Sequence, residues 1–216
     1  MINNHKDIVY HYCSVEVFLS IISNSVLWLS DITKSNDSKE CSWINEIIKN
    51  KLYEYLNHNF PDKISLIQEL EKVRRPSLSF YVGCFSENFD SQYHWSEYAQ
   101  SGEGLAIGFS KTYLEEINKY KKWNPYSPYL FDKVIYNKEK HEKFSDKAVE
   151  KICKDFSLWE MAGALVNLGV EYALYKNPSF KDEKEWRIVC LFSSEYAQRN
   201  HFITGVSLSE MFLRGK

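Results

Sequence analysis

Residues 183–192 read Glu-Lys-Glu-Trp-Arg-Ile-Val-Cys-Leu-Phe, a charged start followed by five apolar residues. An apolar run of this length predicts a buried strand. Side chains alternate between the two faces of a strand, so Glu183, Glu185 and Arg187 are expected on one side. The segment therefore predicts paired carboxylates at the mouth of a strand. An ion pair at a strand end is the structural alternative, because charged pairs are common there.

The residues before this segment alternate between strand and helix patterns. Strands are predicted at 8–12, 26–30, 77–86, 105–109 and 130–136. Helices are predicted after the capping residue Ser14, at about 40–56, from about 62 to before Pro76, and at 92–99. A long late helix is predicted to run until near Lys176, with apolar positions at Val149, Ile152, Phe156, Trp159, Ala162, Leu165 and Leu168.

This order of elements predicts an α+β fold with a mixed, largely antiparallel sheet, a helical insertion and a long late helix. The chain has 216 residues, of which 44% are hydrophobic and 16% aromatic, enough for one large core. We expect a single domain over residues 1–216, with the helical insertion at about 38–75.

Composition narrows the range of partners and compartments. A net charge of −2 gives no overall basic field for nucleic acid. No apolar run approaches the roughly 18 residues of a membrane span, and the first residues lack a signal-peptide core, so a cytoplasmic protein is expected. The cysteines form no Cys-x-x-Cys pair and the histidines lack ligand spacing, so we expect reduced thiols and no metal.

Several separated blocks resemble domain-of-unknown-function family 2971. The resemblance lies in Tyr-His-Tyr at 10–12, Leu-Trp-Leu-Ser at 27–30 with Asn36, Asp37 and Glu40, and Cys-Phe-Ser at 84–86. Its most specific part is His-Trp-Ser-Glu-Tyr-Ala at 94–99 followed by Gly-Glu-Gly-Leu-Ala-Ile-Gly-Phe at 102–109. Lys176 and residues 183–187 complete the set. The resemblance implies a fold and names no reaction.

The chain is more weakly similar to the ADP-ribosyltransferases. That resemblance implies a first strand bearing His or Arg, a middle strand bearing Ser or Tyr, and a late strand bearing a catalytic Glu, sometimes as Glu-x-Glu. His11, Ser86 and the pair Glu183/Glu185 occupy these positions in order. The resemblance therefore implies these four as catalytic residues and NAD as co-substrate.

Cleavage of the nicotinamide–ribose bond needs a carboxylate near the anomeric carbon, where positive charge develops. Glu185 is the expected stabiliser, Glu183 the group that activates an acceptor, and Ser86 a residue that orients Glu185. His11 is the expected donor to the ribose or adenylate. The residues expected to contact NAD are Tyr12, Tyr93, Trp95, Tyr98 and Arg187.

Each residue also has a structural interpretation. A histidine between tyrosines on a strand is often half-buried and satisfied within the fold. A serine at a strand end often bonds the backbone. Trp95 and Tyr98 are three residues apart on a predicted helix and suit a core. Arg187 would neutralise a catalytic carboxylate; pairing with Glu183 would leave Glu185 available.

Two functions of different class follow. The first is an ADP-ribosyltransferase-like enzyme that uses NAD to modify an unidentified macromolecule, as a bacterial toxin or anti-phage effector. The second is a non-catalytic ligand-sensing or protein-interaction domain on a related scaffold. A hydrolase of another N-glycosidic bond would use similar carboxylates and stays open.

Overall fold

The computed structural model describes residues 7–32, 42–72, 78–116, 129–157, 168, 170–193 and 205–207. Among these residues, six strands form one sheet in the order β5-β1-β4-β7-β6, with β3 beside β4. The strands are β1 Ile8–Cys13, β3 Ser30–Asp31, β4 Leu78–Ser86, β5 Leu105–Ser110, β6 Tyr129–Lys133 and β7 Glu185–Ser193. Every pairing in this sheet is antiparallel. The predicted α+β fold with a largely antiparallel sheet is confirmed.

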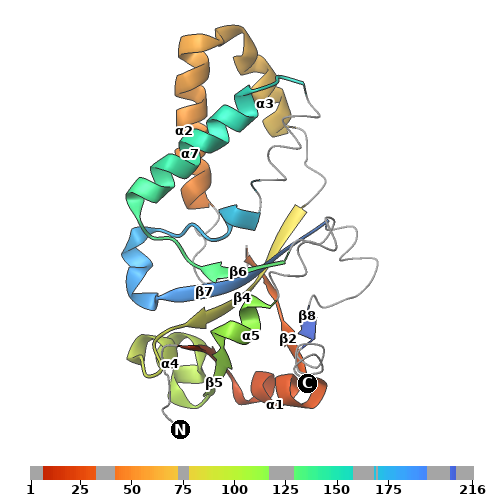
Figure 1. The fold of residues 1–216 in the computed structure, drawn as a ribbon, viewed down its shortest axis with the longest axis vertical. Helices are drawn as coiled ribbons and strands as arrows, with labels where there is room; N and C mark the ends of the chain where they lie inside the picture. Colours follow the sequence, from red (N-terminus) through yellow and green to blue (C-terminus); the bar gives the residue numbers. More distant parts are fainter. Residues whose placement is uncertain are drawn as a thin grey trace.

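Helices lie at both ends of the sheet (Figure 1). Helices α2, α3 and α7 gather at one end, and α1, α4 and α5 lie around the other. Their bounds are α1 Val15–Asn24, α2 Ser42–Asn59, α3 Ile64–Lys72, α4 Gln92–Tyr98, α5 Lys111–Glu115 and α7 Lys138–Cys153, with short 3-10 helices η3 Pro61–Lys63, η4 Gln100–Gly102 and η5 Pro178–Glu183. A separate two-stranded sheet joins β2 Val26–Trp28 to β8 Gly205–Ser207.

Two faces of the main sheet must be distinguished. Directly opposed residues of an antiparallel pair point to the same face. Because Glu185 opposes Ser86, and Ser86 opposes Tyr10, these three define the Glu185 face. Phe85 opposes Trp186, and these two define the Trp186 face. The Trp186 face packs into an apolar core with residues of α1, β2 and α5, among them Ile21, Leu27 and Leu114.

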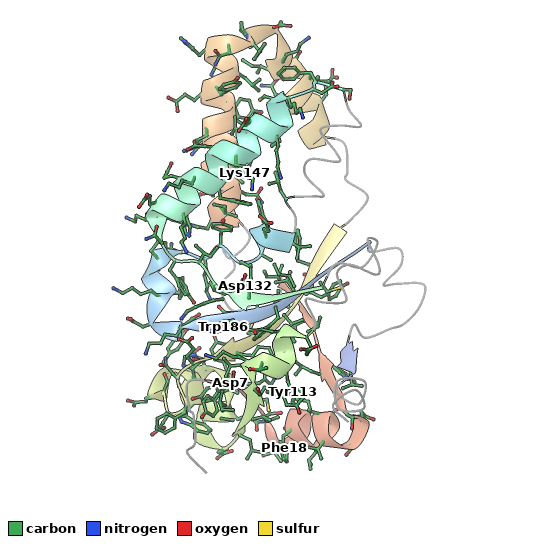
Figure 2. All side chains as sticks on the ribbon, in the orientation of Figure 1. Asp7, Phe18, Tyr113, Asp132, Lys147 and Trp186 are labelled. Atoms are coloured by element: carbon green, nitrogen blue, oxygen red, sulfur yellow. The ribbon has the colours of Figure 1, made fainter. Side chains whose placement is uncertain are left out.

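The helical layer formed by α2, α3 and α7 has its own apolar core. Ile44, Leu56, Ala148 and Ile152 are buried between these helices, and Figure 2 shows side chains filling the space between α2 and α7. Both helices of the predicted insertion are present at 42–59 and 64–72. The layer is therefore built on the apolar periodicity read from the sequence.

The late helix ends sooner than predicted. Helix α7 stops at Cys153, and Phe156 is not helical. The Asp155 carboxylate accepts a hydrogen bond from the Ser157 backbone N–H at 2.8 Å, a local bond that competes with helical pairing. Phe156 instead packs its ring 5.2 Å from that of Phe60. The predicted helical positions Trp159, Ala162 and Leu165 lie outside the described residues, and Leu168, the last predicted position, is helical.

A histidine joins the helical layer to the sheet. The Trp43 indole N–H donates to His141 Nδ1 at 3.2 Å, so Nε2 carries the proton and donates to the Ile135 carbonyl at 2.8 Å. The same carbonyl accepts the backbone N–H of Lys176 at 3.2 Å, and residue 135 forms a parallel bridge with Tyr175. These bonds fix the backbone just before the charged segment.

Candidate functional site

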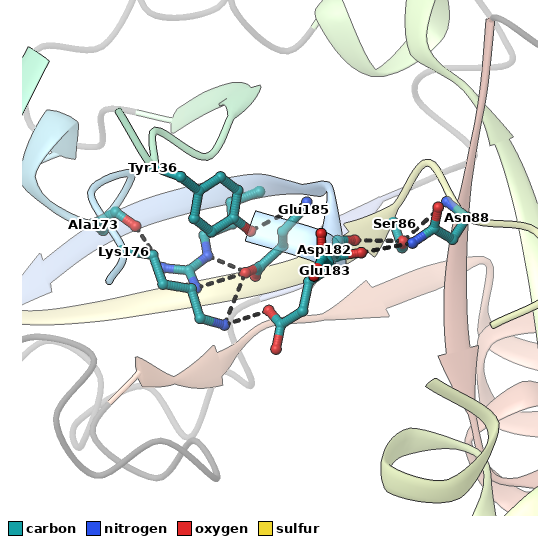
Figure 3. A network of polar contacts seen from close by, with 9 residues as sticks. Ser86, Asn88, Tyr136, Ala173, Lys176, Asp182, Glu183 and Glu185 are labelled. Carbon is teal, nitrogen blue, oxygen red and sulfur yellow. Dashed lines mark hydrogen bonds and ion pairs between the residues drawn. The ribbon is translucent and has the colours of Figure 1, made fainter. Parts of the chain in front are cut away.

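Four buried charged side chains meet at the start of β7, and we call them the quartet: Lys176, Glu183, Glu185 and Arg187. Each is at most 6% exposed. Lys176 Nζ donates to Glu183 Oε2 at 2.6 Å and to Glu185 Oε2 at 3.1 Å. Figure 3 shows Lys176, Glu183 and Glu185 pointing toward one another. One ammonium therefore bridges both carboxylates.

Arg187 completes the quartet through a two-pronged contact with Glu185. Its Nε donates to Glu185 Oε1 at 2.7 Å and its Nη2 to Oε2 at 2.9 Å. Nη1 donates to the Ala173 carbonyl at 2.6 Å. Planar guanidinium groups suit this fork geometry. Arg187 thus pairs with Glu185, and the pairing with Glu183 that would have left Glu185 available is not present.

The local backbone explains how Glu183 reaches the quartet. Strand β7 begins only at Glu185. The prediction that Glu183 shares a strand face with Glu185 and Arg187 through strand alternation is therefore wrong. It ends the 3-10 helix η5, which Asn177 caps by accepting the Ser179 N–H at 3.0 Å. Lys184 then adopts a left-handed conformation, with φ of 47°. This turn directs both carboxylates to Lys176.

The quartet holds Glu185 in its ionised form. Burial alone would raise the pKa of this carboxyl, but the charges of Arg187 and Lys176, with the Arg187 hydrogen bonds, outweigh it and lower the pKa to about 2. Burial, with the charge of Glu185 beside it, raises the pKa of the Tyr136 hydroxyl, which accepts the Glu185 backbone N–H at 3.3 Å. Glu185 therefore stays a carboxylate throughout the neutral range.

We expect the stability of the protein to fall in acid because of this shift. Glu185 has a lower pKa folded, about 2, than its ordinary value of 4.5, so its contribution is complete above pH 4.5 and is lost as pH falls toward 2. The linked free energy is about 3.5 kcal/mol at most, from ~1.4 kcal/mol for each pKa unit. Urea unfolding between pH 7 and pH 2 measures it. An equal pH dependence in the double variant Arg187→Met/Glu185→Leu would contradict this assignment.

Ser86 is buried beside the quartet and bonds backbone groups. It opposes Glu185 in the sheet, but its hydroxyl donates to the Glu183 backbone carbonyl at 2.7 Å and accepts the Asn88 N–H at 3.0 Å. The Asn88 side chain donates to the Asp182 carbonyl at 2.8 Å (Figure 3). The predicted bond that orients the Glu185 carboxylate is therefore replaced by one that fixes η5.

His11 lies on the other face of the sheet from Glu185. It follows Tyr10, which opposes Ser86, so its side chain points to the Trp186 face. Its ring lies 5.8 Å from that of Phe85, and Nδ1 is 2.9 Å from the Cys84 carbonyl. Burial lowers the pKa of His11. The structure therefore does not bring His11 together with Ser86 and Glu185, because a side-chain period of two places neighbours on opposite faces.

Helix α4 brings aromatic side chains to the Glu185 face. Tyr12 from β1 packs its ring 5.0 Å from those of His94 and Trp95, and its hydroxyl donates to the Asn88 carbonyl at 2.8 Å. The Trp95 indole donates to Asp90 at 2.9 Å. Tyr12 and Trp95, both predicted to contact NAD, are thus packed and paired.

Tyr93 and Tyr98 lie at the edge of the site, 47% and 36% exposed. The Tyr93 ring lies 6.1 Å from that of Tyr98, and burial, with the charge of Glu183 beside it, raises the pKa of Tyr93. Burial, with the charge of Glu183 beside it, raises the pKa of Tyr98. Two of the predicted aromatic residues therefore border the quartet at Glu183.

Lys176, His94 and Cys84 were not predicted as site residues. Lys176 belonged only to the family resemblance, and a lysine ahead of a loop gives no sign that it will be buried. The charges of Glu185 and Lys176 interact with the His94 imidazole. Cys84 opposes Arg187, is exposed, and is near enough to Glu185 to contribute to the lowered pKa of that carboxyl. Strand register alone brings Cys84 to the site.

Two further observations concern the described part of the chain. It contains no group of three or more His, Cys, Asp or Glu side chains that could hold a metal ion. None of its helices is both long and apolar enough to cross a membrane.

Fold and site together define an α+β protein whose antiparallel sheet carries a buried quartet of two cations and two carboxylates. Residues 94–188 match the model of DUF2971, a family described as proteins of unknown function. The matched region runs from α4 into β7 and contains the whole quartet. The resemblance predicted from the sequence is thereby confirmed over these residues. No curated protein matched the chain. No solved structure matched it.

Proposed function

We propose that the protein is an ADP-ribosyltransferase-like enzyme that binds NAD between α4 and the start of β7 and transfers ADP-ribose to a macromolecule. The observation that carries this proposal is the meeting of Glu183 and Glu185 on one Lys176 ammonium, beside the exposed rings of Tyr93 and Tyr98. Carboxylates next to an aromatic surface suit a sugar cation and a planar leaving group.

The order of the strands supports the proposal. The first, middle and late strands expected to carry the reacting groups are β1, β4 and β7, and these are neighbours in the sheet. Tyr10, Ser86 and Glu185 form one row across them. The row brings the end of β4, the start of β7 and the middle of β1 side by side. His11 is excluded from this place by its orientation, so the proposal assigns it no part in the reaction.

Glu183 is the better candidate for the acting carboxylate. Both oxygens of Glu185 accept hydrogen bonds from Arg187, and one also accepts from Lys176. Such saturation leaves Glu185 little capacity to contact a sugar. Glu183 borders the exposed tyrosines and accepts from Lys176 through Oε2. Glu185 and Arg187 are then positioning residues that hold Lys176 in place.

In the proposed reaction, the bond between the ribose anomeric carbon and nicotinamide nitrogen breaks, and its electron pair leaves with nicotinamide. The Glu183 carboxylate stabilises the positive charge that develops on the ribose. An acceptor nucleophile then bonds to the anomeric carbon, and its proton passes to Glu183. Lys176 holds the Glu183 carboxylate in position through its hydrogen bond to Oε2.

Nicotinamide release from labelled NAD, with cell lysate as the source of acceptors, tests the proposal. We expect Glu183→Gln to lower the release rate by roughly 100-fold or more, because removing an electrostatic stabiliser has effects of this size. Glu139→Gln is the matched control, since the Glu139 side chain is 74% exposed and forms an i,i+4 pair with Lys143. Equal release by wild type and Glu183→Gln, with both proteins folded by thermal melting, rejects the assignment.

A ligand-sensing domain without chemistry is the second candidate, and the pairing of Glu185 favours it. The four charges of the quartet cancel, and Ser86 serves the backbone. This candidate predicts that NAD or another ligand binds. It also predicts that no nicotinamide is released from NAD, whichever acceptor mixture is supplied. Calorimetric binding of NAD beside the release assay separates the two.

A further inference from the structure

His94 is a buried side chain whose hydrogen bonding is incomplete. It is 5% exposed, and its Nδ1 is buried without a hydrogen-bond partner among the described residues. Buried polar atoms are nearly always paired, so each exception calls for an explanation. The hydrogen bond from its backbone N–H to the Ser91 hydroxyl, 3.5 Å long, caps α4 and leaves the ring unaccounted for.

The surroundings of His94 are those of a ligand subsite. Its ring centroid lies 5.0 Å from that of Tyr12, 5.6 Å from Tyr93 and 5.8 Å from Tyr98. Burial lowers the pKa of His94; the Glu185 charge opposes this and the Lys176 charge adds to it. The imidazole is therefore neutral near pH 7, and a neutral imidazole offers one acceptor nitrogen.

The side chains that cover His94 are themselves at the surface. Tyr93 and Tyr98 are the most exposed of its ring neighbours, and exposed side chains change rotamer in nanoseconds or less. A ligand that reaches the imidazole would require these two rings to rotate. It would then meet their aromatic faces and the charges of Glu185 and Lys176, which act on His94, so a planar polar group suits the chemistry of this position.

We propose that His94 Nδ1 is a ligand-contact atom that accepts a hydrogen bond from the N–H of a planar amide group held against Tyr93 and Tyr98. The inference rests on the proposed function, in which the nicotinamide carboxamide of NAD supplies that N–H. An anionic ring is disfavoured here, because the Glu183 charge acts on the same two tyrosines. His94 thereby sets the specificity of the site for amide over acid.

Binding of nicotinamide and of nicotinate to the full chain tests this assignment, with calorimetry for affinity and ¹⁵N-labelled histidine for the ring. In wild type, nicotinamide shifts the Nδ1 resonance of His94 and nicotinate does not bind. His94→Phe removes the acceptor and is expected to weaken nicotinamide about tenfold or more, as loss of a buried hydrogen-bond partner does. His94→Asn places its amide oxygen near Nδ1 and is expected to stay within about threefold of wild type.

Several outcomes overturn the assignment. They are no nicotinamide binding to folded wild type, equal affinity for nicotinate, an unchanged Nδ1 resonance, or full affinity in His94→Phe. The wild-type resonance decides even where His94→Phe does not fold. Because binding is measured without turnover, nicotinamide that binds through His94 but is never released from NAD rejects the enzyme and keeps the subsite. Nicotinamide release from NAD that does not depend on His94 keeps the enzyme and rejects the subsite.

Discussion

Replacing Arg187 with methionine is expected to lower the free energy of unfolding by about 3–5 kcal/mol, the range for breaking a buried ion pair by removing one partner. Arg187 is 1% exposed and gives Glu185 two hydrogen bonds. Its loss leaves Glu185 buried with Lys176 as its remaining cation in the quartet. Urea unfolding at pH 7 measures the change through the midpoint and slope.

A double variant distinguishes the cost of leaving the Glu185 charge unpaired from the cost of losing the packing of the Arg187 side chain. In Arg187→Met/Glu185→Leu both members of the pair become apolar, and we expect a large part of the stability to return. Lys143→Met is the matched surface control, because its ion pair with Glu139 has both side chains 74% exposed; a change within about 0.5 kcal/mol is expected there. Additive effects of Arg187→Met and Glu185→Leu would show that the pair is not coupled.

Gly104→Ala is expected to destabilise the protein by about 3 kcal/mol or more, because the new Cβ has no room. It would lie 2.3 Å from the Cys13 carbonyl oxygen and 2.9 Å from Ala99 Cα, both backbone atoms that cannot move aside. The clash would separate the start of β5 from the end of β1, the pair that carries Tyr12. Thermal or urea unfolding of the purified variant gives the change.

Gly102 provides the control for this substitution, two residues earlier in the same turn. A Cβ at Gly102 meets nothing within 4 Å, but its φ of +97° disfavours any side chain. We expect Gly102→Ala to cost about 1–2 kcal/mol from backbone conformation alone. If Gly104→Ala proved no more harmful than Gly102→Ala, the close approach at Gly104 would be wrong.

Local pattern was enough to predict most elements. The strand predicted at 77–86 and the helix predicted after the capping residue Ser14 correspond to β4 and α1, where Ser14 accepts the Val17 N–H. The end of α7 was not predicted, because the apolar spacing continued through Phe156 while Asp155 bonded locally to Ser157. The period of apolar residues indicates which side chains can be buried. It does not indicate whether a local side-chain hydrogen bond replaces a helical backbone hydrogen bond.

The site was predictable in its carboxylates but not in its partners. Residues 183–187 predicted charged side chains at the start of a strand, and Glu183, Glu185 and Arg187 are buried there. Whether His11 or Tyr10 faces Glu185 depends on the register between β1 and β4, which no single strand encodes. The approach of Lys176 and of His94 depends on packing between distant segments. Contacts between residues far apart in the chain are therefore the part of the site that the sequence does not predict.

The Ile135 carbonyl has a mechanical consequence for the protein. It receives hydrogen bonds from the His141 ring on α7 and from the Lys176 backbone, so one carbonyl links α7 to the backbone that carries the bridging lysine. A displacement of α7 would therefore act on the backbone of Lys176 as well as on β6, which precedes α7 in the chain. A substitution in the helical layer that removes the His141 bond would thus act on the quartet through this one carbonyl.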